Sequence, residues 1–140
     1  MTFIQPRTLE LLPHPFFIVT EGMGDARFVD ELLEFKNISN CSVGCPSQQS
    51  ARGSGKDGFP EYFASIQVAR GRLNSARLRG LLVIADANAS ADKAFKAITT
   101  ALESAMFPAP KRPFSIEGTD LRVAAYLLPG EGRTGTLAGC

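Results

Sequence analysis

The sequence predicts a single α/β domain built on a central, mostly parallel sheet of four or five strands flanked by helices. Short runs that are apolar throughout alternate along the chain with amphipathic segments of helical periodicity, as in sheets covered on both faces. The length of 140 residues suits one domain. No internal repeat or linker-like segment is present. We therefore expect one domain over residues 1–140, with a core over about 15–130 and a glycine-rich tail over 131–140.

The first strand is predicted over residues 16–22, "FFIVTEG", which is apolar and β-branched and is closed by a glycine. A helix is predicted over 24–37, because apolar residues recur there at helical spacing. The residues expected on its inner face are Phe28, Val29, Leu32 and Leu33.

A short second strand is predicted over 41–46, followed by a polar, glycine-rich loop over 47–58. Pro60 is typical of the first turn of a helix, and Gly71 is expected to end that helix. Its inner face is predicted to consist of Tyr62, Phe63, Ile66 and Ala69.

The run "LLVIADANAS" predicts a third strand from about residue 80 to 85. Ser90 is a suitable N-cap for a helix over 91–106, whose apolar residues again recur at helical spacing. Two further strands are predicted over 114–118 and 121–130.

Composition excludes several classes of protein. The formal net charge of +1 argues against a polyanion-binding surface over the whole chain. No apolar run approaches the roughly 20 residues that a membrane helix needs, and no signal peptide is evident. The cysteines Cys41, Cys45 and Cys140 are odd in number, which favours a reducing, cytoplasmic compartment over a disulfide framework. With His14 as the only histidine, a zinc site is not expected.

Acidic and amide side chains stand where two predicted strands end. Glu21 ends the first strand, Asp25 follows one helical turn later, and Asp86 with Asn88 ends the third strand. Ligand sites of parallel sheets lie at the carboxyl ends of the strands. Carboxylates gathered there would repel one another, and a hard cation such as Mg²⁺ or Mn²⁺ would relieve this. These residues equally fit acids that cap backbone amides or pair with arginines.

Two stretches, "VTEGMGDARFV" and "LLVIADANAS", resemble the signature motifs of Toprim domains, a strand ending in Glu-Gly and a later strand ending in Asp-x-Asp. Toprim domains occur in topoisomerases, bacterial primases, recombination proteins and overcoming-lysogenization-defect (OLD) nucleases. The chain is most similar to stand-alone Toprim-like proteins of unknown function related to the OLD nucleases. "SGKDGFPEYF" and "YLLPGEG" also match their pattern, and the similarity covers roughly residues 15–137.

The resemblance implies a Mg²⁺-dependent (or Mn²⁺-dependent) phosphodiesterase or nuclease that acts on nucleic acid. Glu21 would be a metal ligand or general acid/base, Asp86 the main ligand and Asp25 a supporting one. Asp92 would be an additional acid, although its place in a first helical turn explains it as well.

Two departures from the pattern support an alternative. Asn88 stands in place of the second aspartate, which removes one negative charge, and Ala138 stands where an acid is common. The alternative is a catalytically decayed Toprim-like module that binds or regulates a partner. A homo-oligomer or a larger complex is also compatible with the sequence.

Basic residues offer candidate phosphate contacts. Lys56 lies in "GSGKDG", which lacks the spacing of a P-loop but offers a point charge to a phosphate. Arg77 and Arg79 belong to a basic connector that could attract a nucleic-acid backbone. Few aromatic residues lie near this connector in the sequence, so base stacking has little support.

Overall fold

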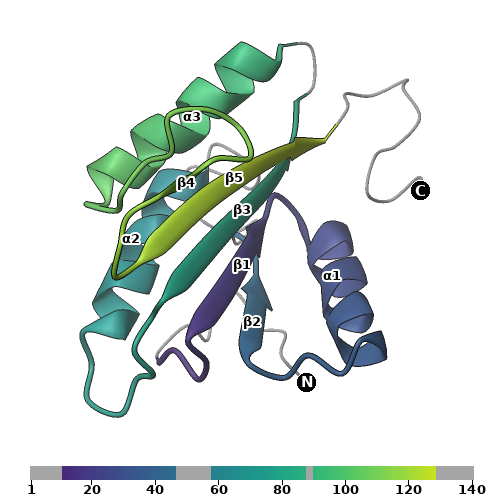
Figure 1. Cartoon of the computed structure of the whole chain (residues 1–140), viewed down its shortest axis with the longest axis vertical. Coiled ribbons are helices and arrows are strands. Elements are labelled where there is room, and N and C mark those ends of the chain that lie inside the picture. The colour runs from purple at the N-terminus through teal and green to yellow at the C-terminus, as the bar shows by residue number, and fades with distance from the viewer. Residues whose placement is uncertain (1–10, 47–57, 88–89, 129–140) are drawn as a thin grey trace.

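The structure, a computed structural model, describes residues 11–46, 58–87 and 90–128 and has the predicted α/β architecture (Figure 1). Its helices are α1 (Met23–Phe35), α2 (Phe59–Arg70) and α3 (Ala91–Ser104). Its strands are β1 (Phe16–Thr20), β2 (Cys41–Gly44), β3 (Gly80–Asp86), β4 (Ile116–Glu117) and β5 (Arg122–Leu128). The strands form one five-stranded sheet, so the predicted fold class is confirmed.

The strand order in the sheet is β2-β1-β3-β5-β4. β2, β1, β3 and β5 run parallel, and only the two-residue edge strand β4 is antiparallel to its neighbour β5. β1 and β3 are neighbours, with Thr20 beside Ile84 in register. Their carboxyl ends therefore meet at the same edge of the sheet.

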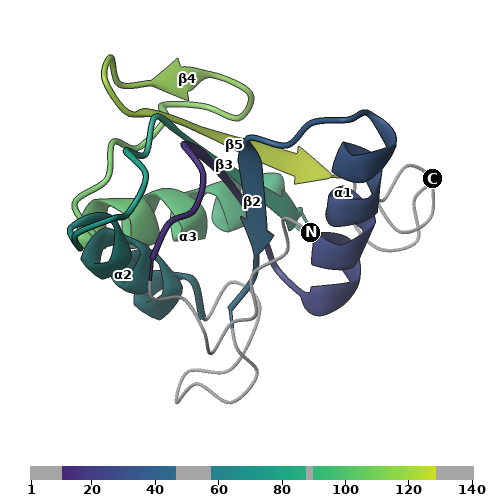
Figure 2. The ribbon, with the colours of Figure 1, turned by 90° about the horizontal axis from the view of Figure 1, so that it is seen from below.

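The main core lies between the sheet and the two packed helices α2 and α3 (Figure 2). Alternate residues of the central strands, such as Val19 and Val83, point into it and are fully buried. Aromatic rings extend this core on α2, where Phe59 and Phe63 stack with ring centroids 5.2 Å apart. The predicted inner face of α2 is buried throughout, as its apolar spacing indicated.

On the opposite face, α1 packs over β1 and β2. Its buried stripe runs through Ala26, Val29 and Leu33, whereas Phe28 and Leu32 are exposed. The prediction that all four large apolar residues face inward was therefore wrong for two of them. The physical reason is that α1 covers only the β1–β2 side of the sheet, where a single narrow stripe makes contact.

Local signals locate most element ends. Ser90 caps α3 as predicted, because its hydroxyl accepts a hydrogen bond of 3.3 Å from the Lys93 amide. Gly71 follows the last residue of α2. The predicted loop over 47–58 and the predicted tail over 131–140 lie almost entirely outside the described residues. Within the described parts of the chain, no helix is long and apolar enough to cross a membrane.

Candidate functional site

The carboxyl ends of β1 and β3 form the point where the chain reverses its direction of travel across the sheet (Figure 1). From β1 the chain passes through α1 to β2 on one side, and it then returns through α2 to β3 on the other side. Open α/β sheets bind ligands at such switch points, because the two connections leave the strand ends in opposite directions and open a crevice. By this rule the expected ligand position, which we call the crevice, is beside residues 21 and 86.

Glu21 lies in this crevice and contacts the neighbouring strand. β1 ends at Thr20, two residues earlier than predicted, because the Thr20 hydroxyl donates a hydrogen bond of 3.0 Å to the Gly22 carbonyl and turns the chain. Glu21 is thereby directed toward β3, where its Oε1 accepts a hydrogen bond of 2.8 Å from the Asp86 amide. The Asp86 carboxylate belongs to the same residue as this amide. The Glu21 and Asp86 side chains therefore lie in one small region.

Asp25 joins the same region from the first turn of α1. Burial, and then the negative charges of Asp86 and Glu21, raise the pKa of the Asp25 carboxyl above its ordinary value. These charges act across short distances, so Glu21, Asp25 and Asp86 form one electrostatically coupled group, which we call the acidic cluster. The negative charges of Asp86 and Glu21 thus disfavour the ionised form of Asp25.

The acidic cluster has the donor chemistry of a Mg²⁺ site but not a closed shell of ligands. Within the described residues, no three histidine, cysteine or acidic side chains are arranged so that they could hold a metal ion directly. Magnesium commonly binds through one or two carboxylates and keeps several waters, which such an open arrangement allows. Asn88 and Lys56, the other predicted contacts, lie outside the described residues. Asp92 is exposed in the first turn of α3.

Arg77 and Arg79 lie at the opposite end of the sheet from the acidic cluster. They precede β3, whereas Asp86 ends it, and a seven-residue strand separates the two ends by about 20 Å. Arg77 forms an exposed ion pair with Asp120, and this arginine lowers the pKa of the Asp120 carboxyl. The two arginines therefore cannot contact a phosphate bound at the acidic cluster. A nucleic acid would have to extend along the sheet to touch both.

Two free cysteines lie at opposite ends of β2. Cys45 is buried just after β2, and burial together with the charge of Asp25 raises its pKa to about 11. Burial also raises the pKa of the Cys41 thiol at the start of β2. Both cysteines are free, and no zinc site forms around them in the described part of the chain. The raised pKa values leave both thiols protonated at neutral pH.

The structure also gathers aromatic residues that the sequence did not single out. Phe16, Phe114 and Tyr126 come from three separate segments, and all three are exposed on the described surface. A signal was present in β5, where Arg122, Ala124 and Tyr126 alternate with buried Val123 and Ala125. That alternation is typical of a strand with one face open to solvent.

We compared the chain with models of protein families, with curated proteins and with solved structures, and no match was found.

Proposed function

We propose that the acidic cluster binds Mg²⁺ or Mn²⁺ and that the protein is a metal-dependent phosphodiesterase of nuclease type. The observation that carries the proposal is the convergence of Glu21, Asp25 and Asp86 at the switch point of the sheet. Burial and then repulsion from Asp86 and Glu21 raise the pKa of Asp25, and a bound cation would relieve the repulsion. The resemblance of the two strand-end motifs to Toprim domains supports the same assignment.

Each member of the cluster has a distinct part in this proposal. Asp86 and Asp25 would hold the cation through direct or water-mediated contacts, as hard oxygen ligands do. The bound cation would polarise a phosphoryl group and lower the pKa of a water molecule. Glu21 is held at the end of β3 by the Asp86 amide, where it could accept a proton from an attacking water.

Calorimetric titration with Mg²⁺ and Mn²⁺ tests the metal site. We expect wild-type protein to bind at millimolar concentrations or tighter, and Asp86→Asn to weaken binding about tenfold or more, since one carboxylate charge is lost at the ion. Glu61→Gln removes an exposed first-turn acid from α2 and serves as the matched control, with binding unchanged. Absence of binding, or equal binding by Asp86→Asn and wild type, would overturn the proposal.

A second candidate function is a binding or regulatory module without catalysis. The specific observation in its favour is that the described acidic residues form no ready three-ligand group. The identity of residue 88 also favours a module without catalysis, because the amide of Asn88 in place of a carboxylate weakens a cation site.

Cleavage assays on labelled single-stranded and duplex DNA and RNA distinguish the two functions. Metal-dependent cleavage by wild type that is lost in Asp86→Asn would establish the phosphodiesterase. Inactive wild type with activity gained in Asn88→Asp would instead identify a decayed site. If wild type and Asn88→Asp are both inactive and neither binds metal, the binding or regulatory module is favoured.

A further inference from the structure

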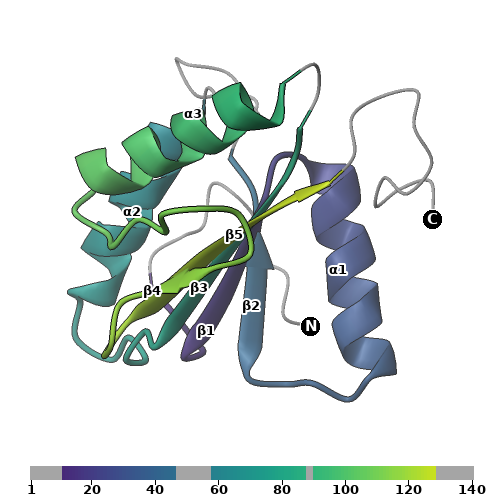
Figure 3. The ribbon, with the colours of Figure 1, turned by 45° about the horizontal axis from the view of Figure 1, so that its top comes forward.

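The two faces of the sheet are covered unequally. α2 and α3 cover one face completely enough to bury Leu81, Val83 and Val123. On the other face α1 packs mainly on β1 and β2, with Ile84 of β3 also beside its cluster, and Figure 3 shows α1 to one side of β4. We call the part of this face that no described helix covers, over β5 and β4 and the amino ends of β3 and β1, the open face.

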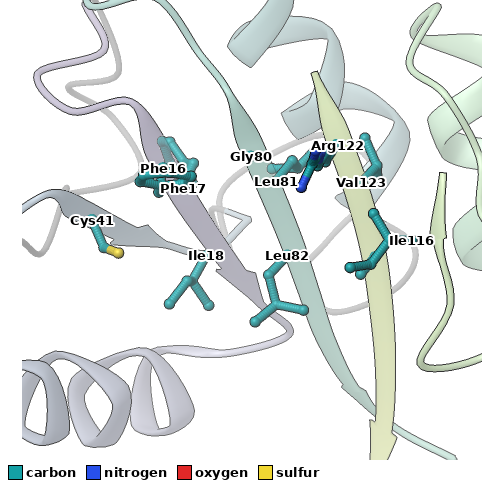
Figure 4. Close-up of a pocket in the computed structure, with 11 residues that line it drawn as sticks. Phe16, Phe17, Ile18, Cys41, Gly80, Leu81, Leu82, Ile116, Arg122 and Val123 are labelled. Carbon is teal, nitrogen blue, oxygen red and sulfur yellow. The ribbon is translucent and has the colours of Figure 1, made fainter. Parts of the chain in front are cut away.

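The open face contains a shallow hollow of about 250 Å³ near the amino ends of the strands (Figure 4). Its floor and walls are apolar and include Phe16, Ile18, Leu82 and Ile116. The one charged side chain that lines it is Arg122. An arginine within an apolar hollow is typical of a site for a ligand with both a flat apolar part and an anionic part.

Three exposed aromatic rings lie on the open face: Phe16 lines the hollow, whereas Phe114 and Tyr126 pack on each other beside the carboxyl half of β5. Phe16, Phe114 and Tyr126 are 38%, 60% and 41% exposed. The ring of Phe16 lies across Gly80, where an added Cβ would stand 2.7 Å from its Cδ1. The rings of Phe114 and Tyr126 pack against each other with centroids 4.7 Å apart and planes at 49°. Gly80 and the strand register therefore hold two aromatic surfaces on one face.

Phe114 occupies an unfavourable backbone conformation to reach this position. Its φ of 67° lies in the left-handed region, which costs a residue with a Cβ about 1–2 kcal/mol. Its amide donates a hydrogen bond of 3.0 Å to the Ala125 carbonyl, which fixes the segment against the exposed edge of β5. The positive φ belongs to the turn Arg112–Ser115, in which Pro113 precedes Phe114 and the Ser115 amide donates a hydrogen bond of 3.2 Å to the Arg112 carbonyl.

Positive charge surrounds the aromatic rings. The Arg122 amide donates a hydrogen bond of 3.0 Å to the Arg79 carbonyl, so these exposed residues are neighbours at the amino end of the sheet, and Arg122 lines the hollow. Lys111 and Arg112 are exposed in the segment that leads to Phe114. Acidic residues offset part of this charge, because Asp120 interacts with Arg79 as well as with Arg77, and Asp86 lies on the same face as Tyr126. Asp120 is engaged by Arg77, and Glu117 pairs in register with Val123, whose side chain points to the core.

We propose that the open face binds single-stranded nucleic acid. Bases would stack on Phe16, Phe114 and Tyr126, and phosphates would contact Arg122 and Arg79. Base–aromatic stacking beside a basic groove is the general means by which proteins hold single strands. Duplex DNA cannot use the rings in this way, because its bases are already stacked on one another.

The open face leads directly to the acidic cluster. Tyr126 lies beside Ile84 in register, and Asp86 follows two residues later on the same face, about 7 Å along the strand. A strand stacked on Tyr126 would therefore carry a phosphodiester toward Asp86. In this respect the inference names the substrate class of the proposed function. Binding to the aromatic rings does not itself require the metal.

Fluorescence anisotropy with a labelled twelve-nucleotide oligothymidylate, in EDTA, tests the inference. We expect saturable binding that weakens as salt rises, with a duplex of the same length bound less tightly. Tyr126→Leu and Phe114→Leu keep an apolar side chain but remove the ring, and each should weaken binding about fivefold or more. Phe35→Leu, at a ring 80% exposed on α1, is the matched control and should leave binding unchanged.

A second measurement does not depend on how the variants fold. Ultraviolet crosslinking of wild-type protein to the same oligonucleotide should label peptides that contain Phe16, Phe114 or Tyr126. Crosslinks confined to other peptides, a preference for duplex, or equal losses in Phe35→Leu and Tyr126→Leu would each overturn the inference. So would a dimer, observed by sedimentation, that Tyr126→Leu dissociates while oligonucleotide binding is absent.

The two proposals can fail separately. Oligonucleotide binding in EDTA that persists in Asp86→Asn, without any metal binding by wild type, would retain the open-face site and reject the phosphodiesterase. Metal binding at the acidic cluster without oligonucleotide binding would retain the metal site and reject the open-face site.

Discussion

Replacement of Asp25 by asparagine should stabilise the metal-free protein at neutral pH. Burial and the charges of Asp86 and Glu21 raise the pKa of Asp25 above 3.8, so the folded chain keeps this proton to higher pH than the unfolded chain. Well below pH 3.8, Asp25 is protonated in both the folded and the unfolded chain, so it does not lower the free energy of unfolding. As pH rises above 3.8 the unfolded chain ionises first, and the folded state loses stability until its own Asp25 has ionised.

Glu61→Gln isolates this effect from the helix dipole. Both substitutions remove an acid from the first turn of a helix and lose a similar dipole interaction, but Glu61 is exposed on α2. Solvent-screened charge pairs are worth about 0.2–1 kcal/mol each, so two neighbouring carboxylates give about 1 kcal/mol in total. Asp25→Asn should therefore melt about 3 °C above Glu61→Gln at pH 7.

Thermal denaturation followed by circular dichroism in EDTA, between pH 3 and pH 7, measures this difference. The gap between the two variants should close near pH 3. Addition of Mg²⁺ should then stabilise Glu61→Gln more than Asp25→Asn, because only the former retains the full acidic cluster. An Asp25→Asn variant that melts below Glu61→Gln at pH 7, or an equal gap at pH 3, would refute the reasoning.

Three further predictions concern the fold. The Tyr62 hydroxyl is buried and has no hydrogen-bond partner within the described residues. Tyr62→Phe should therefore raise the free energy of unfolding, measured in urea, by about 1 kcal/mol. A lower free energy of unfolding would show that the hydroxyl has a partner. Ile98→Ala leaves a cavity in the main core and should cost about 2–5 kcal/mol in the same assay, whereas a cost under 1 kcal/mol would mean that the core collapses around it. Ser90→Ala removes the cap of α3 and should cost about 1 kcal/mol by thermal denaturation, with Ser90→Thr as a control that retains most of it.

The fold class could be predicted because each strand and helix carries a local signal. The buried run of β3 and the apolar spacing of α2 are visible without any tertiary information. The inner face of α1 could not be assigned fully, since Phe28 and Leu32 have the same local spacing as the buried residues. Which of them is buried depends on how much of the sheet lies beneath the helix, and that is a tertiary property.

The acidic cluster was partly predictable for a topological reason. Glu21 and Asp86 each follow the carboxyl end of a parallel strand, so they had to share one edge of the sheet. Their direct contact depends on β1 and β3 being neighbours in a particular register, which the sequence does not specify. Arg77 and Arg79 were linked to that site only by their closeness to β3 in the chain. Because they precede the strand, they belong to its other end.

The aromatic rings of the open face were missed for a related reason. Phe16, Phe114 and Tyr126 are far apart in the sequence and share one face of the sheet only through the β1-β3-β5 pairing and the segment before β4. The sequence offered few aromatic residues near the arginines, and this counted against base stacking. Strand pairing removes this argument against base stacking, because it places Arg122 and Phe16 in the same hollow.

The contact between Glu21 and the Asp86 amide spans 65 positions of the chain and also governs when the site can exist during folding. The first half of the chain can pair β1 with β2 early, but the acidic cluster requires β3 to insert beside β1. Closing so long a loop is slow compared with forming a helix, because its entropy must be lost before the contacts stabilise it. The crevice is therefore among the last features to assemble, and a cation held there would stabilise the finished sheet rather than any intermediate that lacks β3.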